Sequence, residues 1–120
     1  EFARNVCGLR GAHTTEVNPK TKHPVITTMA EQEALIASGD MGGSMRLGSY
    51  DCDLAEGSIS RLAYGEGRIS ERHRHRYEFN NQYRMQLEGK GLRIAGINPK
   101  RNLVEIIELP NHPFFVGVWA

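Results

Sequence analysis

The stretch ERHRHRYEFNN, from Glu71 to Asn81, is the part of the chain that most strongly constrains its fold. Arg and His alternate along it, and in an extended strand residues two apart share a face. The alternation therefore predicts a single strand over residues 69–79. One face of this strand would carry Arg72, Arg74 and Arg76, and the other would carry His73, His75 and Tyr77.

Three guanidinium groups on one face repel one another unless anions lie opposite them. Arg is suited to such a position, because its planar fork binds a carboxylate or a phosphate through two parallel hydrogen bonds. Two interpretations stay open: a solvated edge strand whose surface ion pairs contribute little to stability, and a site for a carboxylate or a phosphate. A nucleic-acid partner is disfavoured, because 15 Lys and Arg are balanced by 14 Asp and Glu.

Length and composition limit the class of protein. With 120 residues, the chain forms one domain or part of one, and its 39% hydrophobic and 24% charged residues are typical of a soluble globular protein. Nothing at the start of the sequence resembles a signal peptide, and no apolar run approaches the roughly 18 residues of a membrane span, so no membrane role is predicted. The two cysteines, Cys7 and Cys52, lack the spacing of a disulfide framework and predict free thiols in a reducing cytoplasm.

Hydrophobic periodicity and turn residues outline the other elements. Helices or helix ends are predicted at residues 1–6, 30–37, 58–64 and 81–88, with Ser58 and Asn80 as N-caps of the last two. Strands or extended connections are predicted at residues 13–18, 23–29, 44–54, 92–97, 103–109 and 114–118. The segments 92–97 and 103–109 are expected to form a hairpin, and the apolar run 114–118 a buried strand. This mixture predicts the α/β class.

Four further signals are weaker. Cys7 lacks the preceding strand and the Gly two residues earlier that a nucleophile elbow needs, so it is interpreted as a packing residue at a helix end. A zinc site would combine a Cys with His112 and the two histidines of the alternating stretch, without CxxC or HxxxH spacing. The DMGGSMRLG stretch, residues 40–48, has the glycines of a phosphate loop but not its Lys-Ser/Thr ending. Glu16, alone after two threonines, is by itself more typical of a solvated acid.

Five segments, taken together, resemble one family. They are FARNV (2–6), AHTTEVNPKTKHPVI (12–26), DMGGSMRLGSYDC (40–52), ISERHRHRYEFNNQYR (69–84) and LVEIIELPNHPFFVGV (103–118). In this order they resemble the class I glutamine amidotransferase domain of CTP synthases, over nearly the whole chain. The resemblance implies a flavodoxin-like α/β fold, in which residues 1–120 are part of one amidotransferase domain and supply the C-terminal half of its sheet.

By this resemblance, the whole enzyme is a glutamine-hydrolysing ligase of pyrimidine biosynthesis. Its amidotransferase domain would release ammonia from L-glutamine with a Cys–His–Glu triad, and the ammonia would pass to a separate synthetase domain. There ATP would phosphorylate UTP, and ammonia would displace the phosphate to give CTP. The resemblance also implies Mg²⁺ with the nucleotides, GTP as an allosteric activator, a tetrameric assembly and a cytoplasmic location.

The resemblance carries site roles onto a few residues of this chain. Glu16 would bind the α-ammonium group of glutamine, Arg76 would bind its α-carboxylate, and Tyr77 would contribute through its backbone. Recognition of a zwitterion needs one fixed anion and one forked cation, and a ligand that leaves a buried charge unmatched is rejected. Further candidates for contact with an effector or with the synthetase domain are Arg46, Arg72 and Arg74, and Arg46 has the alternative interpretation of a solvated strand charge.

The resemblance also places the triad outside these residues. Its nucleophile elbow, G-x-C-x-G, would precede FARNV, and its catalytic His and Glu would lie in an HPE motif after GVWA. No catalytic residue and no metal ligand is therefore expected in this chain, which would be inactive alone and would expose sheet edges and apolar faces. The alternatives are a non-enzymatic amino-acid-binding, anion-binding or regulatory module and, less favoured, a small metal-binding or anion-binding protein built on the Arg/His strand.

Overall fold

The computed structural model describes residues 1–28 and 46–119 of the chain. Its helices are α1 (Phe2–Asn5), α3 (Ile59–Tyr64), the 3-10 helix η2 (Asn81–Tyr83) and α4 (Arg84–Glu88). Its strands are β1 (His13–Thr14), β2 (Pro24–Thr28), β3 (Arg46–Leu54), β4 (Arg68–His75), β5 (Tyr77–Phe79), β6 (Arg93–Asn98), β7 (Leu103–Glu108) and β8 (Val116–Val118). The predicted helix at 30–37, most of the stretch 40–48 and the first residues of the predicted strand 44–54 lie outside the described residues.

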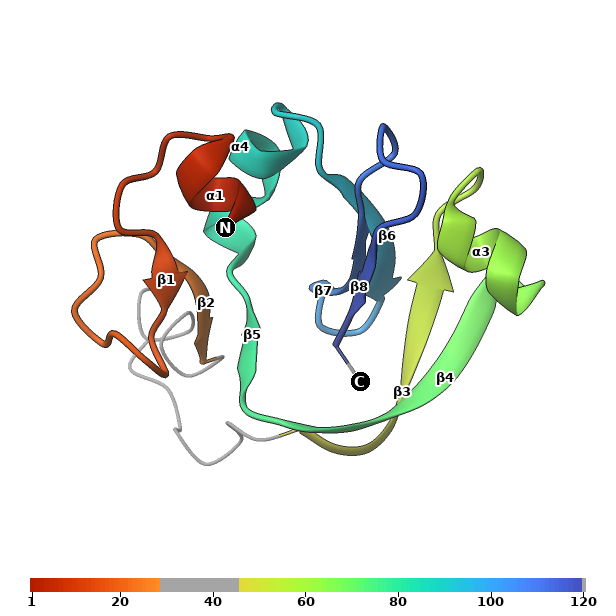
Figure 1. Ribbon diagram of the computed structural model, residues 1–120. Helices are drawn as coiled ribbons and strands as arrows, with labels where there is room; N and C mark the ends of the chain where they lie inside the picture. Colours follow the sequence, from red (N-terminus) through yellow and green to blue (C-terminus); the bar gives the residue numbers. More distant parts are fainter. Residues whose placement is uncertain (29–45, 120) are drawn as a thin grey trace.

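The described strands form two sheets, which Figure 1 shows at the left and at the right of the molecule. The smaller sheet has the order β1-β2-β5, and the larger sheet has the order β4-β3-β6-β7-β8. Strands β1 and β2 run parallel, and the other pairs of described strands are antiparallel. The α/β class predicted from the sequence is confirmed, as is the hairpin, which β6 and β7 form.

The alternating Arg/His stretch passes from one sheet to the other. Strand β4 pairs with β3, from Asp53 opposite Arg68 to Arg46 opposite His75, whereas β5 pairs with β2 in the smaller sheet. Arg76 lies between them in a bend, and Figure 1 shows the chain passing from β4 to β5 along the lower edge of the view. The predicted single strand over residues 69–79 is therefore wrong, because the chain changes its pairing partner at Arg76.

Within β4 the predicted alternation is confirmed. Arg72 and Arg74 are exposed, and His73, between them, is 3% exposed. The bend at Arg76 ends this pattern, and two residues later Glu78 is fully buried. The same run of residues thus supplies an exposed basic face and a set of buried polar groups.

Two short helical segments begin at the predicted caps. The Ser58 hydroxyl accepts a hydrogen bond from the Arg61 N–H (3.1 Å), and the Asn80 side chain accepts one from the Gln82 N–H (3.1 Å). Such caps satisfy N–H groups that have no partner in the first turn. The helix predicted over 81–88 is confirmed as helical, but it divides into η2 and α4.

Glu108 of β7 supplies a second cap to α3. Its carboxylate accepts hydrogen bonds from the Ile59 N–H (3.0 Å) and the Ser60 N–H (2.8 Å), and it also accepts one from the Ser60 hydroxyl. Burial works to raise the pKa of Glu108, but these bonds hold that pKa below its ordinary value. The charge of Glu108 is therefore used to fix α3 on the larger sheet.

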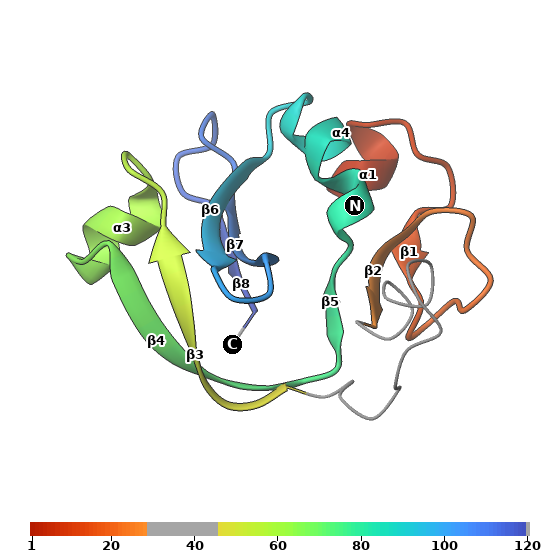
Figure 2. The ribbon, with the colours of Figure 1, turned by 180° about the vertical axis from the view of Figure 1, so that it is seen from behind.

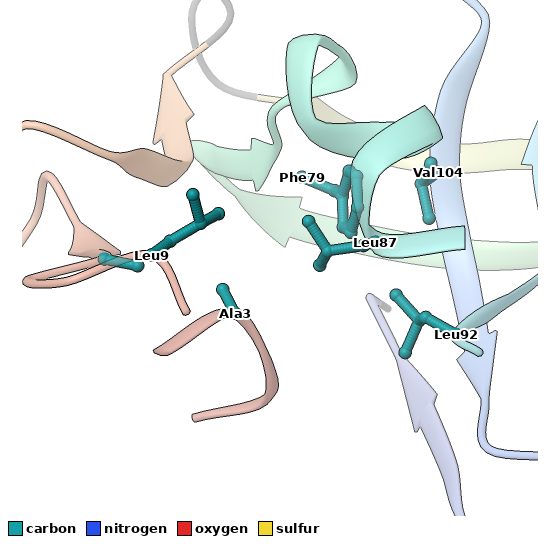
Figure 3. Close-up of a cluster of buried hydrophobic side chains, with 7 residues drawn as sticks. Ala3, Leu9, Phe79, Leu87, Leu92 and Val104 are labelled. Atoms are coloured by element: carbon teal, nitrogen blue, oxygen red, sulfur yellow. The ribbon is translucent and has the colours of Figure 1, made fainter. Parts of the chain in front are cut away.

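The larger apolar cluster lies between the two sheets and the helices α1 and α4. Figure 2 shows these two helices beside each other near the N-terminus, and Figure 3 shows the side chains of Phe79 and Leu87 close together in the cluster. Burial of each large side chain contributes about 1.5–3 kcal/mol relative to exposure. The buried members are Ala3, Leu9, Ala12, Phe79, Leu87, Leu92 and Val104.

Strand β8 forms one edge of the larger sheet, and both β8 and the two residues before it are only partly covered. Phe114 is 65% exposed, Phe115 is 42% exposed and Val118 is 49% exposed. The prediction of a buried strand at 114–118 is therefore wrong for the described residues, whereas the predicted exposure of apolar edge residues is confirmed. In the described part of the chain, no helix has the length and apolar character needed to cross a bilayer.

Candidate functional site

An open cleft of about 820 Å³ lies where the two sheets meet. Its walls come from the turn after β1, from β2, from the bend between β4 and β5, and from the end of β8. Its size is in the range of pockets that hold small metabolites. The lining residues are Thr14, Glu16, Ile26, Arg74, His75, Arg76, Tyr77, Val118 and Trp119.

Glu16 reaches the cleft from a hydrogen-bonded turn. The Thr15 N–H donates to the Ile26 carbonyl (2.9 Å), and the Thr15 hydroxyl contacts the Thr27 hydroxyl (3.1 Å). The Glu16 N–H itself donates to the Thr14 hydroxyl (3.2 Å). The two threonines before Glu16 thus attach its backbone to β2 and leave its carboxylate exposed.

Arg76 enters the cleft from the bend between the sheets. The residue before it, His75, pairs with β3, and the residue after it, Tyr77, lies opposite Thr28 of β2. Arg76 is therefore held from both sides, while its side chain is exposed. Neither Arg76 nor Glu16 makes an ion pair with any other described residue.

The cleft brings together the three residues that the resemblance implies for substrate binding. Glu16, Arg76 and Tyr77 line one cavity, although Glu16 and Arg76 are 60 residues apart in the sequence. Arg74 lines it too, whereas Arg72 does not and lies exposed opposite Ser49. A carboxylate and guanidinium groups above apolar walls match the opposite charges of an amino-acid zwitterion. The binding roles themselves stay predictions.

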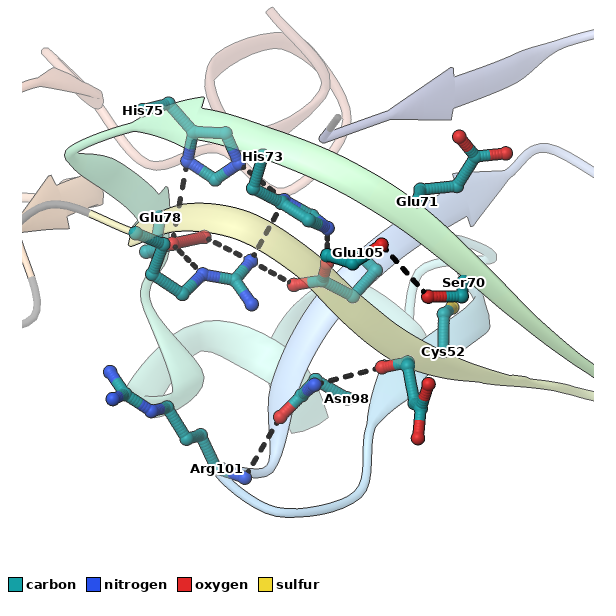
Figure 4. Close-up of polar contacts among 12 residues, drawn as sticks. Cys52, Ser70, Glu71, His73, His75, Glu78, Asn98, Arg101 and Glu105 are labelled. Atoms are coloured by element: carbon teal, nitrogen blue, oxygen red, sulfur yellow. Dashed lines mark hydrogen bonds and ion pairs between the residues drawn. The ribbon is translucent and has the colours of Figure 1, made fainter.

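Behind the bend lies a closed circuit of buried side chains, here named the polar ring. Its five members come from β3, β4, β5 and β7, and Figure 4 shows their contacts. They are Arg46, Glu78, His75, His73 and Glu105. All but His75, whose side chain is 20% exposed, are nearly or fully buried.

The contacts of the polar ring follow one another around the circuit. Arg46 donates from Nε to Glu78 Oε2 (2.8 Å) and from Nη2 to Glu105 Oε1. Glu105 Oε2 lies 2.8 Å from His73 Nε2, and His73 Nδ1 lies 2.8 Å from His75 Nε2. His75 Nδ1 lies 3.4 Å from Glu78 Oε2, which closes the circuit.

Burial changes the protonation of two members of the polar ring. Burial raises the pKa of Glu105 to about 7, against the opposing effect of the Arg46 guanidinium. Burial, followed by repulsion from the Arg46 guanidinium and from His75 when it is protonated, lowers the pKa of His73 to about 4. Near neutral pH, His73 is thus uncharged, and Glu105 gains or loses its proton.

Arg46 corrects one of the interpretations drawn from the sequence. It is fully buried, pairs with both ring carboxylates and lies over the Tyr50 aromatic ring at 4.8 Å from its centroid. The interpretation of Arg46 as a solvated strand charge is therefore wrong, because its guanidinium is used inside the chain. Contact with an effector or with another domain stays an untested prediction, to which this burial gives no support.

Glu78 and Glu105 are polar-ring members whose roles the sequence did not reveal. A signal for Glu105 was present, because it interrupts the apolar run LVEII, and charged residues are rarely buried unless they are paired. The partner that would explain it, Arg46, is 59 residues earlier in the sequence. Only the pairing of β3 with β4 and β6, and of β6 with β7, brings the two together.

The two thiols lack the features of an activated nucleophile. Cys52 is 1% exposed, and burial, reinforced by Glu105, raises its pKa to about 12. Burial also raises the pKa of Cys7, which packs against the larger apolar cluster as predicted and is not part of the cleft lining. A reactive cysteine instead needs a lowered pKa and access to substrate.

The histidines of the zinc alternative are used in separate places. His73 and His75 belong to the polar ring, whereas His112 lies before β8 and accepts a hydrogen bond from the Phe114 N–H (3.1 Å). Among residues 1–28 and 46–119, no group of three or more His, Cys, Asp or Glu has an arrangement that could hold a metal ion. The described residues therefore give no support to the zinc alternative.

Comparison with known proteins gives a consistent result. The family model described as class I glutamine amidotransferase matches residues 25–118. CTP synthases from Halalkalibacterium halodurans and Chloroherpeton thalassium are 55% and 57% identical to this chain over 117 and 118 residues. Each match covers 98% of this chain and 21% of the relative, so the chain spans about a fifth of these relatives' length.

One solved structure shares the fold of this chain. It is described as the glutaminase domain of Trypanosoma brucei CTPS with bound acivicin. The TM-score is 0.85 at 32% sequence identity, and the match covers 98% of this chain and 45% of that chain. The mixed α/β fold with its two curved sheets is therefore that of this glutaminase domain.

Proposed function

Because this chain belongs to the class I glutamine amidotransferase family, we propose that its cleft binds L-glutamine by the α-amino acid end of the molecule. Glu16 binds the α-ammonium group, and the Arg76 guanidinium binds the α-carboxylate through two parallel hydrogen bonds. Tyr77 contributes a backbone group beside Arg76. The observation that carries this proposal is that Glu16 and Arg76 line one cleft and pair with no other described residue.

The remaining lining suits the rest of the ligand. Ile26, Val118 and Trp119 give the cleft an apolar wall against which the methylene groups of glutamine pack. Arg74 adds a second positive charge on the side of Arg76, which favours the carboxylate end. The similar glutaminase domain was solved with acivicin, a glutamine analogue, which supports an amino-acid ligand for this cleft.

For this chain by itself, the proposal is binding of glutamine without hydrolysis. Hydrolysis by the family route needs a cysteine thiolate beside a base. Cys7 and Cys52 are the two cysteines of the sequence, and burial raises the pKa of both. Neither lines the cleft, so neither thiol is placed to attack the glutamine amide.

For the whole protein, we propose the role of a CTP synthase. Its amidotransferase domain supplies ammonia from glutamine to a synthetase domain, which aminates UTP to CTP with ATP and Mg²⁺ under activation by GTP, in a tetramer. The support for this role is the identity of 51–57% to several CTP synthases over about a fifth of their length. A cytoplasmic location accords with the two free thiols.

The test is calorimetric titration of the purified chain with L-glutamine and two blocked relatives. In N-acetyl-glutamine the ammonium is lost, and in glutaminamide the carboxylate is lost. Loss of either charge removes one charge-assisted interaction, so we expect each to bind more weakly by roughly ten- to a hundredfold. Equal affinity for all three ligands, or no binding of glutamine, would contradict the proposal.

Ammonia release tests the statement about hydrolysis separately. The chain is incubated with glutamine alongside a Cys7→Ala variant, and ammonia is measured by a coupled assay. We expect no release above the background of glutamine alone from either protein. Release that disappears in the Cys7→Ala variant would show that Cys7 is a nucleophile after all.

A further inference from the structure

The polar ring lies directly behind the proposed glutamine-binding bend. His75 belongs to both structures, because it lines the cleft and contacts Glu78 and His73 in the ring. His75 and Glu78 also flank Arg76 and Tyr77 in the sequence. The backbone of the bend is therefore attached to the polar ring on both sides.

Glu105 connects the polar ring to the opposite wall of the cleft. Its carboxylate reaches the bend through His73 and His75, and its backbone carbonyl accepts a hydrogen bond from the Trp119 N–H (2.8 Å). Trp119 lines the cleft after β8. One residue of β7 thus contacts groups that hold both sides of the cavity.

The three contacts along the chain Glu105–His73–His75–Glu78 each need one proton to become a hydrogen bond. Two neutral imidazoles bring two protons, so a third must be taken up to complete the set. Among the described residues, His73 Nε2, His75 Nδ1 and Glu105 Oε2 are the ring atoms at these contacts that make no well-aligned hydrogen bond. A third proton at one of these contacts would complete the hydrogen bonds of the polar ring.

Charge balance also requires the third proton. With Arg46 positive and both carboxylates ionised, the polar ring carries one net negative charge in the interior, which is unfavourable. One added proton makes the ring neutral and completes its hydrogen bonds at the same time. When the proton leaves, a buried charge is uncompensated, and two protons remain for the three contacts, so one contact of the chain Glu105–His73–His75–Glu78 lacks a donor.

We propose that Glu105 is a positioning residue for the cleft, and that the proton it shares with His73 keeps the bend at Arg76 in its binding geometry. This inference rests on the proposed binding of glutamine at Arg76. Deprotonation of the polar ring loosens the bend and weakens binding of the amino acid. The cleft is then fully competent at mildly acidic pH and loses affinity at mildly alkaline pH.

The groups that contact Glu105 directly from the neighbouring strands do not titrate near neutrality, and His75 of β4 contacts His73 and Glu78 rather than Glu105. Arg46 stays charged, and the Cys52 thiol, also on β3, has a pKa raised to about 12. From β4, His73 has a pKa lowered to about 4. From β5, Glu78 is bound to Arg46 through both carboxylate oxygens.

The experiment compares the affinity of the 120-residue chain for L-glutamine at about pH 6 and about pH 8, on either side of a pKa near 7. If binding needs the protonated ring, the wild-type affinity falls by up to roughly tenfold at the higher pH. In Glu105→Gln, the amide can donate to His73 and accept from Arg46 without titrating. We expect this variant to bind equally at both pH values, within about twofold, and more tightly than wild type at the higher pH.

Glu108→Gln is the matched control. Glu108 is a buried acid on the same strand, but its carboxylate caps α3 and is not part of the polar ring. We expect it to keep the pH dependence of the wild type. A Glu105→Gln variant that also keeps that dependence would overturn the proposal, because a merely structural role of Glu105 predicts no change in the pH profile.

A measurement without ligand separates this proposal from the proposed function. The backbone amide signals of Arg76 and Tyr77 are followed by NMR as a function of pH. We expect both to shift with a midpoint near the Glu105 pKa of about 7 in wild type, and not in Glu105→Gln. If glutamine fails to bind at any pH but these signals titrate, the proposed function fails and the coupling of Glu105 to the bend stands. If they do not titrate, the coupling fails, even where glutamine binds.

Discussion

The cleft and the polar ring are built from the same kinds of side chain but use them differently. In the polar ring, Arg46 and both glutamates are buried and paired with one another. In the cleft, Glu16 and Arg76 are exposed and pair with no other described residue. Charges that are paired inside a protein hold structure, whereas exposed charges of opposite sign that share a cleft are free to pair with a ligand.

Both regions take residues from the same short stretch. His73 and Glu78 face the interior, whereas Arg74 and Arg76 face outward. Strand alternation accounts for His73, Arg74 and Arg76, and the bend at Arg76 changes the pattern so that Glu78 is buried. The type of residue therefore does not determine its role. Its role is determined by the side of the strand on which it lies and by the change of pairing partner at Arg76.

The largest expected effect is the removal of the cation of the polar ring. Arg46→Met leaves Glu78 and Glu105 buried without their partner, which destabilises the fold by about 3–5 kcal/mol. Urea unfolding at about pH 7 measures it. Arg72→Met, on the exposed face of β4, is the control and is expected to stay within about 0.5 kcal/mol. Similar losses in both variants would remove the distinction between the two regions.

The second prediction concerns the pH dependence of stability. The pKa of Glu105 is raised from its ordinary value of 4.5 to about 7, so its contribution is present below pH 4.5 and is lost as pH rises to about 7. Relative to Glu105→Gln, the wild type should lose about 3 kcal/mol over this window. In wild type, His73 masks much of this loss, because its pKa is lowered to about 4 and its contribution has the opposite sign.

Glu108→Gln is the control for this second prediction, because the pKa of Glu108 is lowered. Its contribution is present above the ordinary carboxylate pKa and is lost as pH falls. Thermal unfolding over the acidic and neutral range should therefore give difference curves of opposite slope for the two variants. Parallel curves would contradict the assignment of the raised pKa to Glu105.

The third prediction tests the cleft against the strand that leads into it. Arg76→Ala removes the forked partner of the ligand carboxylate and should weaken glutamine binding by roughly ten- to a hundredfold. Arg72→Ala removes the same side chain outside the cleft and should leave binding within about twofold. Both should unfold like wild type. If calorimetry finds equal weakening by both substitutions, general basic charge, rather than Arg76, attracts the ligand.

The smallest expected effect belongs to an ion pair at the far end of the β3–β4 ribbon. Arg68 contacts Asp53 across these strands, and its hydrogen bond lowers the pKa of Asp53, but the two side chains are 59% and 45% exposed. Solvent and salt screen such a pair. Asp53→Asn should leave the unfolding curve unchanged. A clear loss of stability would show that exposure does not separate the two classes of charge in this protein.

Local sequence signals predicted most of the described elements. The caps Ser58 and Asn80, the hairpin of β6 and β7, and the alternation of β4 depend on residues close to each other in the chain, and all three are confirmed. The bend at Arg76 was not predictable, because no residue there breaks a strand and the cause is a change of neighbouring strand. The apolar run 114–118 was interpreted as a buried strand for a similar reason, since an apolar sequence does not reveal what covers it.

The cleft and the polar ring also differed in how far the sequence predicted them. Periodicity alone did not single out Glu16 or Arg76, and the resemblance to a family placed them in one site. Neither periodicity nor the resemblance predicted the polar ring, because its members are spread over 60 residues and burial is a property of the packed chain. A single acid in the apolar run LVEII was its one visible sign.

The buried Cys52 thiol can serve as a chemical probe of how often the larger sheet opens. With 1% of its surface exposed and a pKa near 12, it can be alkylated only when the sheet around it opens. In a Cys7→Ala background, the rate of its modification reports the frequency of that opening directly. Ligands or protons that tighten the molecule slow the reaction, and their effect on internal motion becomes measurable without any label on the cleft itself.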